Sequence, residues 1–326
     1  MQSMFRILAL DGGGLKGVFT ASFLAEIERI TGSRVTRYFD LVAGTSTGGI
    51  VALGLGLGLS PAEIRDFYLE YGPRIFPAQR ALPRLARAAR QVFHAKYSAE
   101  ALESALRDRF GDHQLWESSV RLVIPAYDVV RGDVYIYKTP HHECLRTDFT
   151  EYAWRVARAT AAAPTYFPAA INDGGVRLVD GGIWANNPSV VALAEALGYL
   201  RQEKESVFLL SIGTTWAALT SGHRHAFGGL WAWKRKALEF MLAGQVQSAT
   251  NVCTHILGQD HVLRVDPVVP RGYGLDRLSR NLVALGVTEA RKQVNTICRD
   301  FLQAETQPYE PKYRNADCLK GGISHA

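Results

Sequence analysis

Three short apolar runs along the chain have the length and composition of buried strands: Phe5 to Leu10, Phe39 to Ala43, and Val207 to Ile212. After the first run, apolar residues recur at helical spacing from about Val18 to Ile30. A run of small and apolar residues, Gly49 to Leu59, follows the second. This alternation of strand and helix predicts an α/β fold, with a parallel sheet that is covered by helices.

The hydrophobic pattern predicts further elements downstream. Ser60 to Glu63 has the sequence of a helix capping box. A β-hairpin is expected from Arg121 to Val129 and Val134 to Lys138. A short strand should run from Val176 to Val179, and a helix from about Ser189 to Leu200.

The chain carries no internal repeat and no long linker, so we expect a single domain over residues 1–326. Its motif-bearing core should cover about 5–212 and precede a helical or lid portion of about 213–326. With 47% hydrophobic and 21% charged residues, the composition is that of a globular protein. The longest apolar run, Gly48 to Leu59, is too short and glycine-rich to span a bilayer, and no secretory signal is recognised. Four scattered cysteines favour reduced thiols in the cytoplasm and predict no metal site.

The second strand runs into Gly44-Thr45-Ser46-Thr47-Gly48, a G-x-S-x-G sequence. Between a strand and a helix, this sequence is typical of a nucleophile elbow, in which side chains two positions before and after the serine would clash. The turn would place Ser46 at a helix N-terminus, where free N–H groups favour a developing anion. The alternative is an ordinary glycine-rich turn, because a bare G-x-S-x-G often occurs by chance.

A second glycine-rich loop, Asp11 to Gly17, follows the first strand. Its G-x-G-x-x-G spacing matches a dinucleotide-binding fingerprint, but no acidic residue ends the next strand. A P-loop is excluded because Val18 follows where lysine is required. The backbone N–H groups of Gly12, Gly13 and Gly14 could instead form an oxyanion hole, since no side chain shields them. A purely structural turn is the remaining alternative.

A serine nucleophile needs a base, and none of the nine histidines lies in a recognisable catalytic context. Asp180 ends a predicted strand, before Gly181 and Gly182, and open α/β sheets place their sites along the carboxyl edge of the strands. A carboxylate titrates at about 4 and is a weak base, but partial desolvation could raise its pKa. The alternative is an ordinary Asp-Gly turn.

Basic residues give the chain a formal net charge of +6 and gather in one segment, Gln79 to Lys96, that contains no acid. The arginines of this segment are Arg80, Arg84, Arg87 and Arg90. Because apolar residues alternate with them, the segment is either a solvated helix face or a contact for anionic headgroups or an anionic activator. Aromatic and basic residues also adjoin from Trp231 to Lys236, which suits a membrane interface or a packed tryptophan pair.

Four stretches, taken together and in order, resemble the patatin-like phospholipases. They are D-G-G-G-L-K-G at Asp11 to Gly17, G-T-S-T-G at Gly44 to Gly48, A-A-P-T-Y-F-P at Ala162 to Pro168, and D-G-G at Asp180 to Gly182, before N-N-P. The resemblance extends over about two thirds of the chain. It implies a three-layer α/β/α fold with a mainly parallel central sheet, and hydrolysis of acyl esters of glycerolipids without metal or cofactor.

The resemblance also implies a role for individual residues. Ser46 would be the nucleophile and Asp180 the proton acceptor of a Ser-Asp dyad that uses no histidine, while Gly12 to Gly14 would supply the oxyanion hole. Lys16 stands where many relatives have arginine, which keeps the positive charge but loses the bidentate geometry. The other motif residues that would support the site are Asp11, Gly17, Gly44, Gly48, Gly181 and Gly182.

A narrower resemblance, to bacterial antiphage effectors of the CBASS type, is carried by MFRILALDGGGLKG, DLVAGTSTGG and the IFP segment. In that subgroup a cyclic dinucleotide, typically cyclic GMP-AMP, switches on the degradation of membrane phospholipid. The resemblance implies a cytoplasmic enzyme that acts at the inner face of the membrane on phospholipid, with a cyclic dinucleotide activator and no nucleic-acid polymer as partner. Whether it forms a homo-oligomer is left open.

Three alternatives accompany this interpretation. The first is a lipid acylhydrolase of the same family that is constitutively active. The second is a binding module with a patatin fold and no turnover, which the intact Ser46 and Asp180 disfavour. The third is an NAD-dependent oxidoreductase, which the missing ribose-binding acid disfavours.

Overall fold

The computed structural model describes residues 4–77, 95–217, 230–270 and 272–314, without the side chains of 230–238. Its strands are β1 (Phe5–Leu10), β2 (Leu41–Gly44), β3 (Arg121–Asp128), β4 (Asp133–Lys138), β5 (Ala170–Ile171), β6 (Arg177–Asp180), β7 (Val207–Ile212), β8 (Trp216–Ala217), β9 (Val262–Val265) and β10 (Val268–Val269). Its α-helices are α1 (Gly17–Thr31), α2 (Thr47–Gly56), α3 (Pro61–Ile75), α5 (Ala99–Phe110), α6 (Ala153–Thr160), α7 (Gly182–Ala185), α8 (Ser189–Gly198), α10 (Leu230–Leu257) and α11 (Arg280–Asp300). The candidate contacts Arg80, Arg84, Arg87 and Arg90 lie outside the described residues.

The predicted alternation of strand and helix is confirmed, with small shifts of the element bounds. The capping box at the start of α3 is present, because the hydroxyl of Ser60 accepts from the N–H of Glu63 at 3.2 Å and the Glu63 carboxylate accepts from the N–H of Ser60 at 2.7 Å. Phe39, predicted to begin β2, lies before the strand, and its ring packs on Phe301. The predicted hairpin is also present, as the antiparallel pair β3 and β4.

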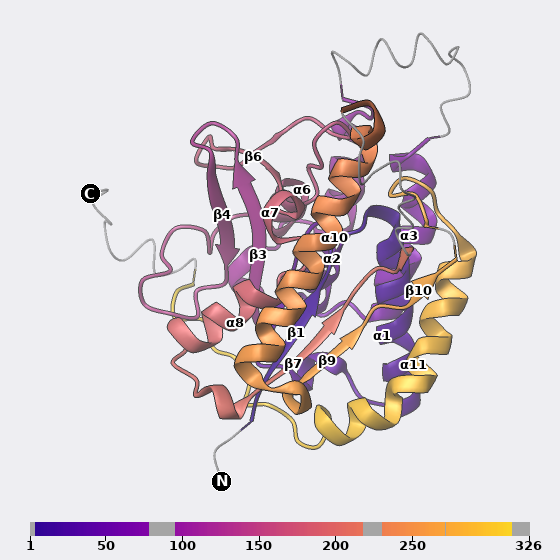
Figure 1. Ribbon diagram of the computed structural model, residues 1–326. Coiled ribbons are helices and arrows are strands. Elements are labelled where there is room, and N and C mark those ends of the chain that lie inside the picture. The colour runs from indigo at the N-terminus through magenta and orange to yellow at the C-terminus, as the bar shows by residue number, and fades with distance from the viewer. Residues whose placement is uncertain (1–3, 78–94, 218–229, 271, 315–326) are drawn as a thin grey trace.

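A central eight-stranded sheet has the order β5-β6-β3-β2-β1-β7-β9, and β4 pairs with β3 beside this path (Figure 1). The pairings among β3, β2, β1, β7 and β9 are parallel. The pairings that add β4, β5 and β6 are antiparallel. The prediction of a mainly parallel central sheet is therefore confirmed.

The sheet has an apolar core on each face, because successive side chains of a strand point to opposite sides. On β1, Leu8 and Leu10 belong to a core that includes residues of α1, α2, α3, α6 and α11. The intervening Ile7 and Ala9 belong to a second core, with residues of α8 and α10. Figure 1 shows α8 and α10 in front of the sheet and α1, α3 and α11 on its other side. The three-layer α/β/α architecture is therefore confirmed.

β2 and β6 occupy the same edge of β3, one after the other. β2 pairs with Arg121–Val123 of β3 and β6 with Ala126–Asp128, while β4 pairs along the opposite edge of β3. Because β6 is antiparallel to β3 and β2 is parallel to it, the carboxyl ends of β2 and β6 meet head to head. Asp180 therefore ends a strand, as predicted, and lies beside the carboxyl end of β2, but its strand is antiparallel to the neighbouring β3.

The chain after Ile212 forms part of the main architecture. β9 extends the sheet beside β7, α10 covers one face, and α11 packs along α1 on the other. Gly286 of α11 lies so close to α1 that a Cβ would come within 2.6 Å of the carbonyl oxygen of Phe19. The helical or lid portion predicted for about 213–326 therefore contains an edge strand and one helix of each covering layer. Among the described helices, none has an apolar stretch long enough to cross a bilayer.

Candidate active site

Ser46 lies in a strained turn between β2 and α2. Its backbone has φ 55° and ψ −122°, a conformation that is uncommon for a residue with a side chain. A Cβ at Gly44 would lie 2.2 Å from the carbonyl oxygen of Gly48, and a Cβ at Gly48 would lie 2.1 Å from that of Leu10. Both glycines are therefore required sterically, as a nucleophile elbow predicts.

The hydroxyl of Ser46 donates a hydrogen bond of 2.6 Å to Oδ2 of Asp180. The other carboxylate oxygen, Oδ1, accepts from the N–H of Gly182 at 2.7 Å, which fixes the orientation of the carboxylate. Gly181 is confined as well, because a Cβ there would lie 2.4 Å from the carbonyl oxygen of Pro125 on β3. The structure thus brings together the two residues that the sequence singled out as nucleophile and base.

Both side chains are largely withdrawn from solvent, since Ser46 is 8% and Asp180 6% exposed. Burial raises the pKa of Asp180 to about 6, and the hydrogen bonds from Ser46 and Gly182 oppose this rise. A carboxylate with this pKa is ionised at neutral pH and is a stronger base than an exposed one. The pair can therefore transfer a proton from the serine hydroxyl to the carboxylate.

Thr160, at the end of α6, supports the elbow and was not identified from the sequence. Its Oγ1 accepts from the N–H of Ser46 at 2.9 Å and donates to the carbonyl oxygen of Pro125 at 2.6 Å. The threonine thereby joins the strained turn to β3. Nothing local distinguishes Thr160 from other threonines at helix ends, so only the tertiary fold identifies it.

The glycine loop after β1 lies against the serine. A Cβ at Gly12 would come within 3.3 Å of the Ser46 Cβ. The N–H of Gly12 already donates to the carbonyl oxygen of Asn186 at 2.9 Å. In the described part of the chain, no acceptor is seen for the N–H groups of Gly13 and Gly14. Of the three N–H groups predicted to form an oxyanion hole, those of Gly13 and Gly14 therefore remain the candidate donors.

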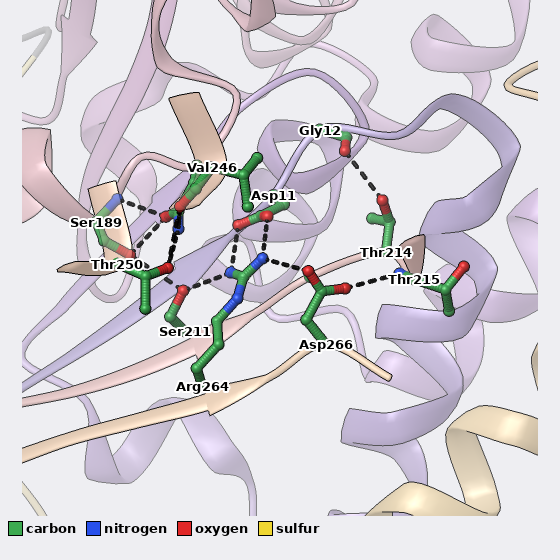
Figure 2. Close-up of polar contacts among 12 residues, drawn as sticks. Asp11, Gly12, Ser189, Ser211, Thr214, Thr215, Val246, Thr250, Arg264 and Asp266 are labelled. Carbon is green, nitrogen blue, oxygen red and sulfur yellow. Dashed lines mark hydrogen bonds and ion pairs between the residues drawn. The ribbon is translucent and has the colours of Figure 1, made fainter. Parts of the chain in front are cut away.

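A buried ion pair anchors the start of this loop (Figure 2). Both carboxylate oxygens of Asp11 accept from Arg264 of β9, at 2.9 Å and 2.6 Å. Arg264 also donates to Asp266 at 2.7 Å, and Asp266 accepts from the N–H of Thr215 at 3.0 Å. The sequence signal for Arg264 is a charged residue within an otherwise apolar strand, which usually has a buried partner.

Two further side chains hold the loop from the β7 side. Figure 2 shows Thr214 beneath the loop, where its hydroxyl donates to the carbonyl oxygen of Gly12 at 3.1 Å. A Cβ at Gly13 would lie 2.3 Å from that hydroxyl, so the two residues are in close contact. Lys16 donates from Nζ to the carbonyl oxygen of Thr215 at 3.1 Å, and burial lowers its pKa. Lys16 therefore anchors the loop to the segment after β7. This contact needs a single hydrogen-bond donor, so it does not depend on the bidentate geometry of an arginine.

The described histidines have partners outside the dyad. Those partners are Glu117 for His113, Thr139 and Glu195 for His141, Cys144 for His142, the Asn251 carbonyl for His255 and the Val207 carbonyl for His261. His94, His223, His225 and His325 lie outside the described residues. Ser46 and Asp180 are thus paired with each other without any histidine of the described part of the chain.

The fold and the site define the class: a three-layer α/β protein with a serine elbow and a buried aspartate in contact. The family model for patatin-like phospholipases matches residues 8–193, more than half of the chain. The chain therefore belongs to the patatin-like phospholipase family.

Similar proteins of this family are described as cGAMP-activated phospholipases. The one from Pseudomonas aeruginosa is 33% identical over 290 residues, which is 88% of this chain and 86% of the relative. The one from Vibrio cholerae is 34% identical and covers 75% of this chain and 76% of the relative. The one from Escherichia coli is 31% identical and covers 94% of both chains.

Proposed function

We propose that the protein is a serine acylhydrolase of the phospholipase A type, which hydrolyses acyl esters of membrane glycerophospholipids. The observation that carries the proposal is the 2.6 Å hydrogen bond from Ser46 to Asp180 on a strained elbow. Membership of the patatin-like phospholipase family supports the substrate class. The residues of the site supply the whole reaction, so no cofactor is needed.

In the first half of the reaction, Oγ of Ser46 attacks the ester carbonyl carbon while Asp180 Oδ2 accepts the hydroxyl proton. The carbonyl electron pair moves to the oxygen, which becomes an oxyanion that the N–H groups of Gly13 and Gly14 can stabilise. When this pair returns, the bond to the alcohol breaks. The proton passes from Asp180 to the departing lysophospholipid oxygen, and the acyl group stays on Ser46.

In the second half, water replaces the alcohol. Asp180 accepts a proton from the water as its oxygen attacks the acyl carbon, and the same oxyanion forms again. Collapse of this intermediate breaks the bond to Oγ and releases the fatty acid. The proton on Asp180 returns to Ser46, so the site ends in its starting state.

The distribution of exposed apolar side chains supports a membrane-embedded substrate. Of the large hydrophobic side chains that are exposed in the described part of the chain, most lie toward the edge of the sheet that carries Ser46. They are Val129, Val130, Val134, Ile171, Ile183, Trp216, Met241 and Val268. A surface of this kind beside a lipid-cleaving site fits the apolar interior of a membrane leaflet.

We propose further that a cyclic dinucleotide such as cyclic GMP-AMP activates the enzyme in antiphage defence, at the cytoplasmic face of the membrane. The support is similarity to three relatives that are described as cGAMP-activated, one of them along 94% of both chains. The arginines predicted to contact an activator or lipid, Arg80, Arg84, Arg87 and Arg90, remain candidates from sequence. A constitutive acylhydrolase is the alternative to be tested.

The catalytic proposal is tested with a soluble short-chain ester and with phospholipid vesicles. Ser46→Ala and Asp180→Asn should each lower kcat by on the order of a thousand-fold, because the nucleophile and its base act as a unit. Ser119→Ala, a serine on the opposite edge of the sheet, is the matched control and should keep wild-type rates. Retention of turnover by purified Ser46→Ala would refute the role of this serine.

The regulatory proposal is tested on the soluble ester, where no membrane is present. At least one member of a panel of cyclic dinucleotides should raise the rate by more than about ten-fold, equivalent to about 1.4 kcal/mol in the barrier. Charge reversal at Arg84 and Arg87 should reduce the response. A high basal rate that no member of the panel changes would leave a constitutive acylhydrolase.

A further inference from the structure

A short segment after β10 touches the glycine loop at Gly14 and Leu15. The carbonyl oxygen of Leu275 accepts from the N–H of Leu15 at 2.8 Å. Gly14 has φ 59°, and a Cβ there would lie 2.2 Å from the same carbonyl oxygen. The backbone of Leu275 therefore rests directly on the part of the loop that carries the candidate oxyanion donors.

The next residue, Asp276, ties this segment to a distant part of the chain. Its Oδ2 forms an ion pair with Nζ of Lys96 and accepts a hydrogen bond of 2.8 Å from the hydroxyl of Tyr97. The side chains are 14% exposed for Asp276 and 25% for Lys96. Burial would raise the pKa of Asp276, but the bonds from Lys96 and Tyr97 outweigh it and hold the pKa below its usual value. The carboxylate is thus ionised and is held by two partners, Lys96 and Tyr97.

Lys96 and Tyr97 are themselves attached to the loop that follows α6. Their N–H groups donate to the carbonyl oxygens of Thr165 and Tyr166 at 2.9 Å and 2.8 Å. The ammonium group of Lys96 also lies 5.2 Å from the centre of the Tyr97 ring. α6 ends in Thr160, which holds the backbone of the serine elbow. Lys96 and Tyr97, which hold Asp276, are therefore linked through the loop after α6 to the serine elbow, while Asp276 itself adjoins the glycine loop.

We infer that Asp276 is a positioning residue for the acyl transfer that is proposed above. Held by Lys96 and Tyr97, it fixes the carbonyl of Leu275, which in turn fixes the loop where Gly13 and Gly14 present their N–H groups. Oxyanion donors act only when they are preorganised within a few tenths of an ångström of the developing charge. Release of Asp276 lets the loop relax and weakens stabilisation of the oxyanion without removing any group that touches substrate.

The inference rests on the proposed function, and a covalent probe separates the two. A soluble fluorophosphonate reacts with an active serine: the Oγ–P bond forms, the P–F bond breaks, fluoride leaves and Asp180 takes the proton. The phosphoryl oxygen needs the oxyanion donors just as an ester does. The rate of labelling therefore reports on the loop without membrane binding or deacylation.

The variant Asp276→Ala should be labelled about ten-fold more slowly than the wild type, a part of the 10²- to 10³-fold cost of losing a whole donor. The same variant should lower kcat on a soluble ester by a similar factor and leave KM within about two-fold, because ground-state binding does not use the oxyanion hole. Asp276→Asn keeps an acceptor for Tyr97 and should lose less. If Asp276→Ala does not fold, Tyr97→Phe is measured in its place. This milder change should also slow labelling.

Glu289→Ala is the matched control, since the Glu289 side chain is 13% exposed, much like that of Asp276, and forms an ion pair with Lys292 at 2.6 Å on α11. It should leave labelling and kcat unchanged. Labelling of folded Asp276→Ala within two-fold of the wild type, or an equal loss in Glu289→Ala, would overturn the inference. A wild-type protein that is neither labelled nor hydrolytic, with or without cyclic dinucleotides, would instead overturn the proposed function and the inference with it.

Discussion

At the scale of single residues, the site combines two features that are unfavourable for the folded state. Ser46 has a backbone conformation that few residues adopt, and Asp180 is a carboxylate with little access to water. Each is compensated locally: Thr160 accepts from the elbow N–H, and Gly182 donates to the carboxylate. Residues held in this way are expected to trade stability for reactivity.

The pH dependence of the reaction should follow the ionisation of Asp180. Its pKa is raised to about 6 by burial, and the residue accepts a proton only when it is ionised. We therefore expect kcat/KM on a soluble ester to rise with pH through about 6 and to level off above it. A pH–rate profile with acyl-chain length held constant checks this, and a rate that is flat from pH 5 to 8 would contradict it.

Asp180→Asn should make the protein more stable at neutral pH while it abolishes turnover. A carboxyl whose pKa is higher in the folded state costs free energy of folding when ionised, and this cost develops as pH rises from about 4 to about 6. The change of about two pKa units corresponds to at most about 3 kcal/mol above pH 6. Urea unfolding of both proteins should show this gain at pH 7.5 and little difference at pH 4, whereas a destabilised variant at pH 7.5 would argue against a desolvated carboxylate.

The sequence identified Ser46 and Asp180 because the elbow and the D-G-G turn are local patterns, in which neighbouring glycines reveal the strain. Thr160, Arg264 and Asp276 could not be found in this way. Their roles depend on which segments meet in space. A charged residue in an apolar strand indicates that Arg264 has a buried partner, but it does not identify that partner. Prediction thus reached the candidate nucleophile and base together with the motif residues around them, and it missed Thr160, Arg264 and Asp276, which hold the site from other segments.

At the scale of elements, the glycine loop after β1, near the N-terminus, is held by two segments from the C-terminal part of the chain. Arg264 of β9 binds Asp11 at the start of the loop, and Leu275 contacts Gly14. Hydrophobic periodicity predicted the strands and helices, since burial on one or two faces imposes a repeat that can be read from the sequence. The direction of β6 could not be predicted, because a buried strand has the same pattern in either orientation.

Replacement of Arg264 alone should destabilise the protein far more than replacement of both Arg264 and Asp11. Arg264→Met leaves the Asp11 carboxylate, whose side chain is 3% exposed, without its counter-charge, at a cost of about 3–5 kcal/mol. The double variant Arg264→Met with Asp11→Asn should recover much of this loss. Free energies of unfolding in urea check the difference. Equal losses in the single and double variants would mean that the ion pair is not the main interaction of Arg264.

At the scale of the whole molecule, exposed apolar side chains are unevenly distributed over the described part of the chain. Exposed valines and isoleucines lie at the β3–β4 turn, in β5 and in α7, and each of these elements adjoins β6, which ends at Asp180. Ile30 and Ile256, at the ends of α1 and α10, are exposed at the opposite edge. We therefore expect this part of the surface, which adjoins the strand of Asp180, to be the part that contacts a lipid surface.

The double variant Val130→Asp and Ile171→Asp should weaken vesicle binding by more than about ten-fold, since burial of each side chain contributes about 1.5–3 kcal/mol. Co-sedimentation of the Ser46→Ala form with phospholipid vesicles measures this without degrading them. Hydrolysis of a soluble ester should be unchanged, because neither apolar side chain takes part in the hydrogen bonds that hold the dyad. Ile256→Asp is the matched control. Equal binding by the double variant and the control would place the membrane contact elsewhere.

Because β2 and β6 meet head to head on one edge of β3, the length of β3 between their pairing sites determines how far apart the two strand ends lie. Ser46 and Asp180 follow or end strands that do not pair with each other, and β3, which pairs with both strands, sets the distance between the two strand ends. One residue inserted or deleted within Ile124–Pro125, between the two pairing sites, would shift one strand end by about 3.3 Å relative to the other and break their hydrogen bond. The number of residues in this part of β3 should therefore tolerate less change than the identity of their side chains. An active protein would also indicate that β2 and β6 have each paired with β3 in the correct register.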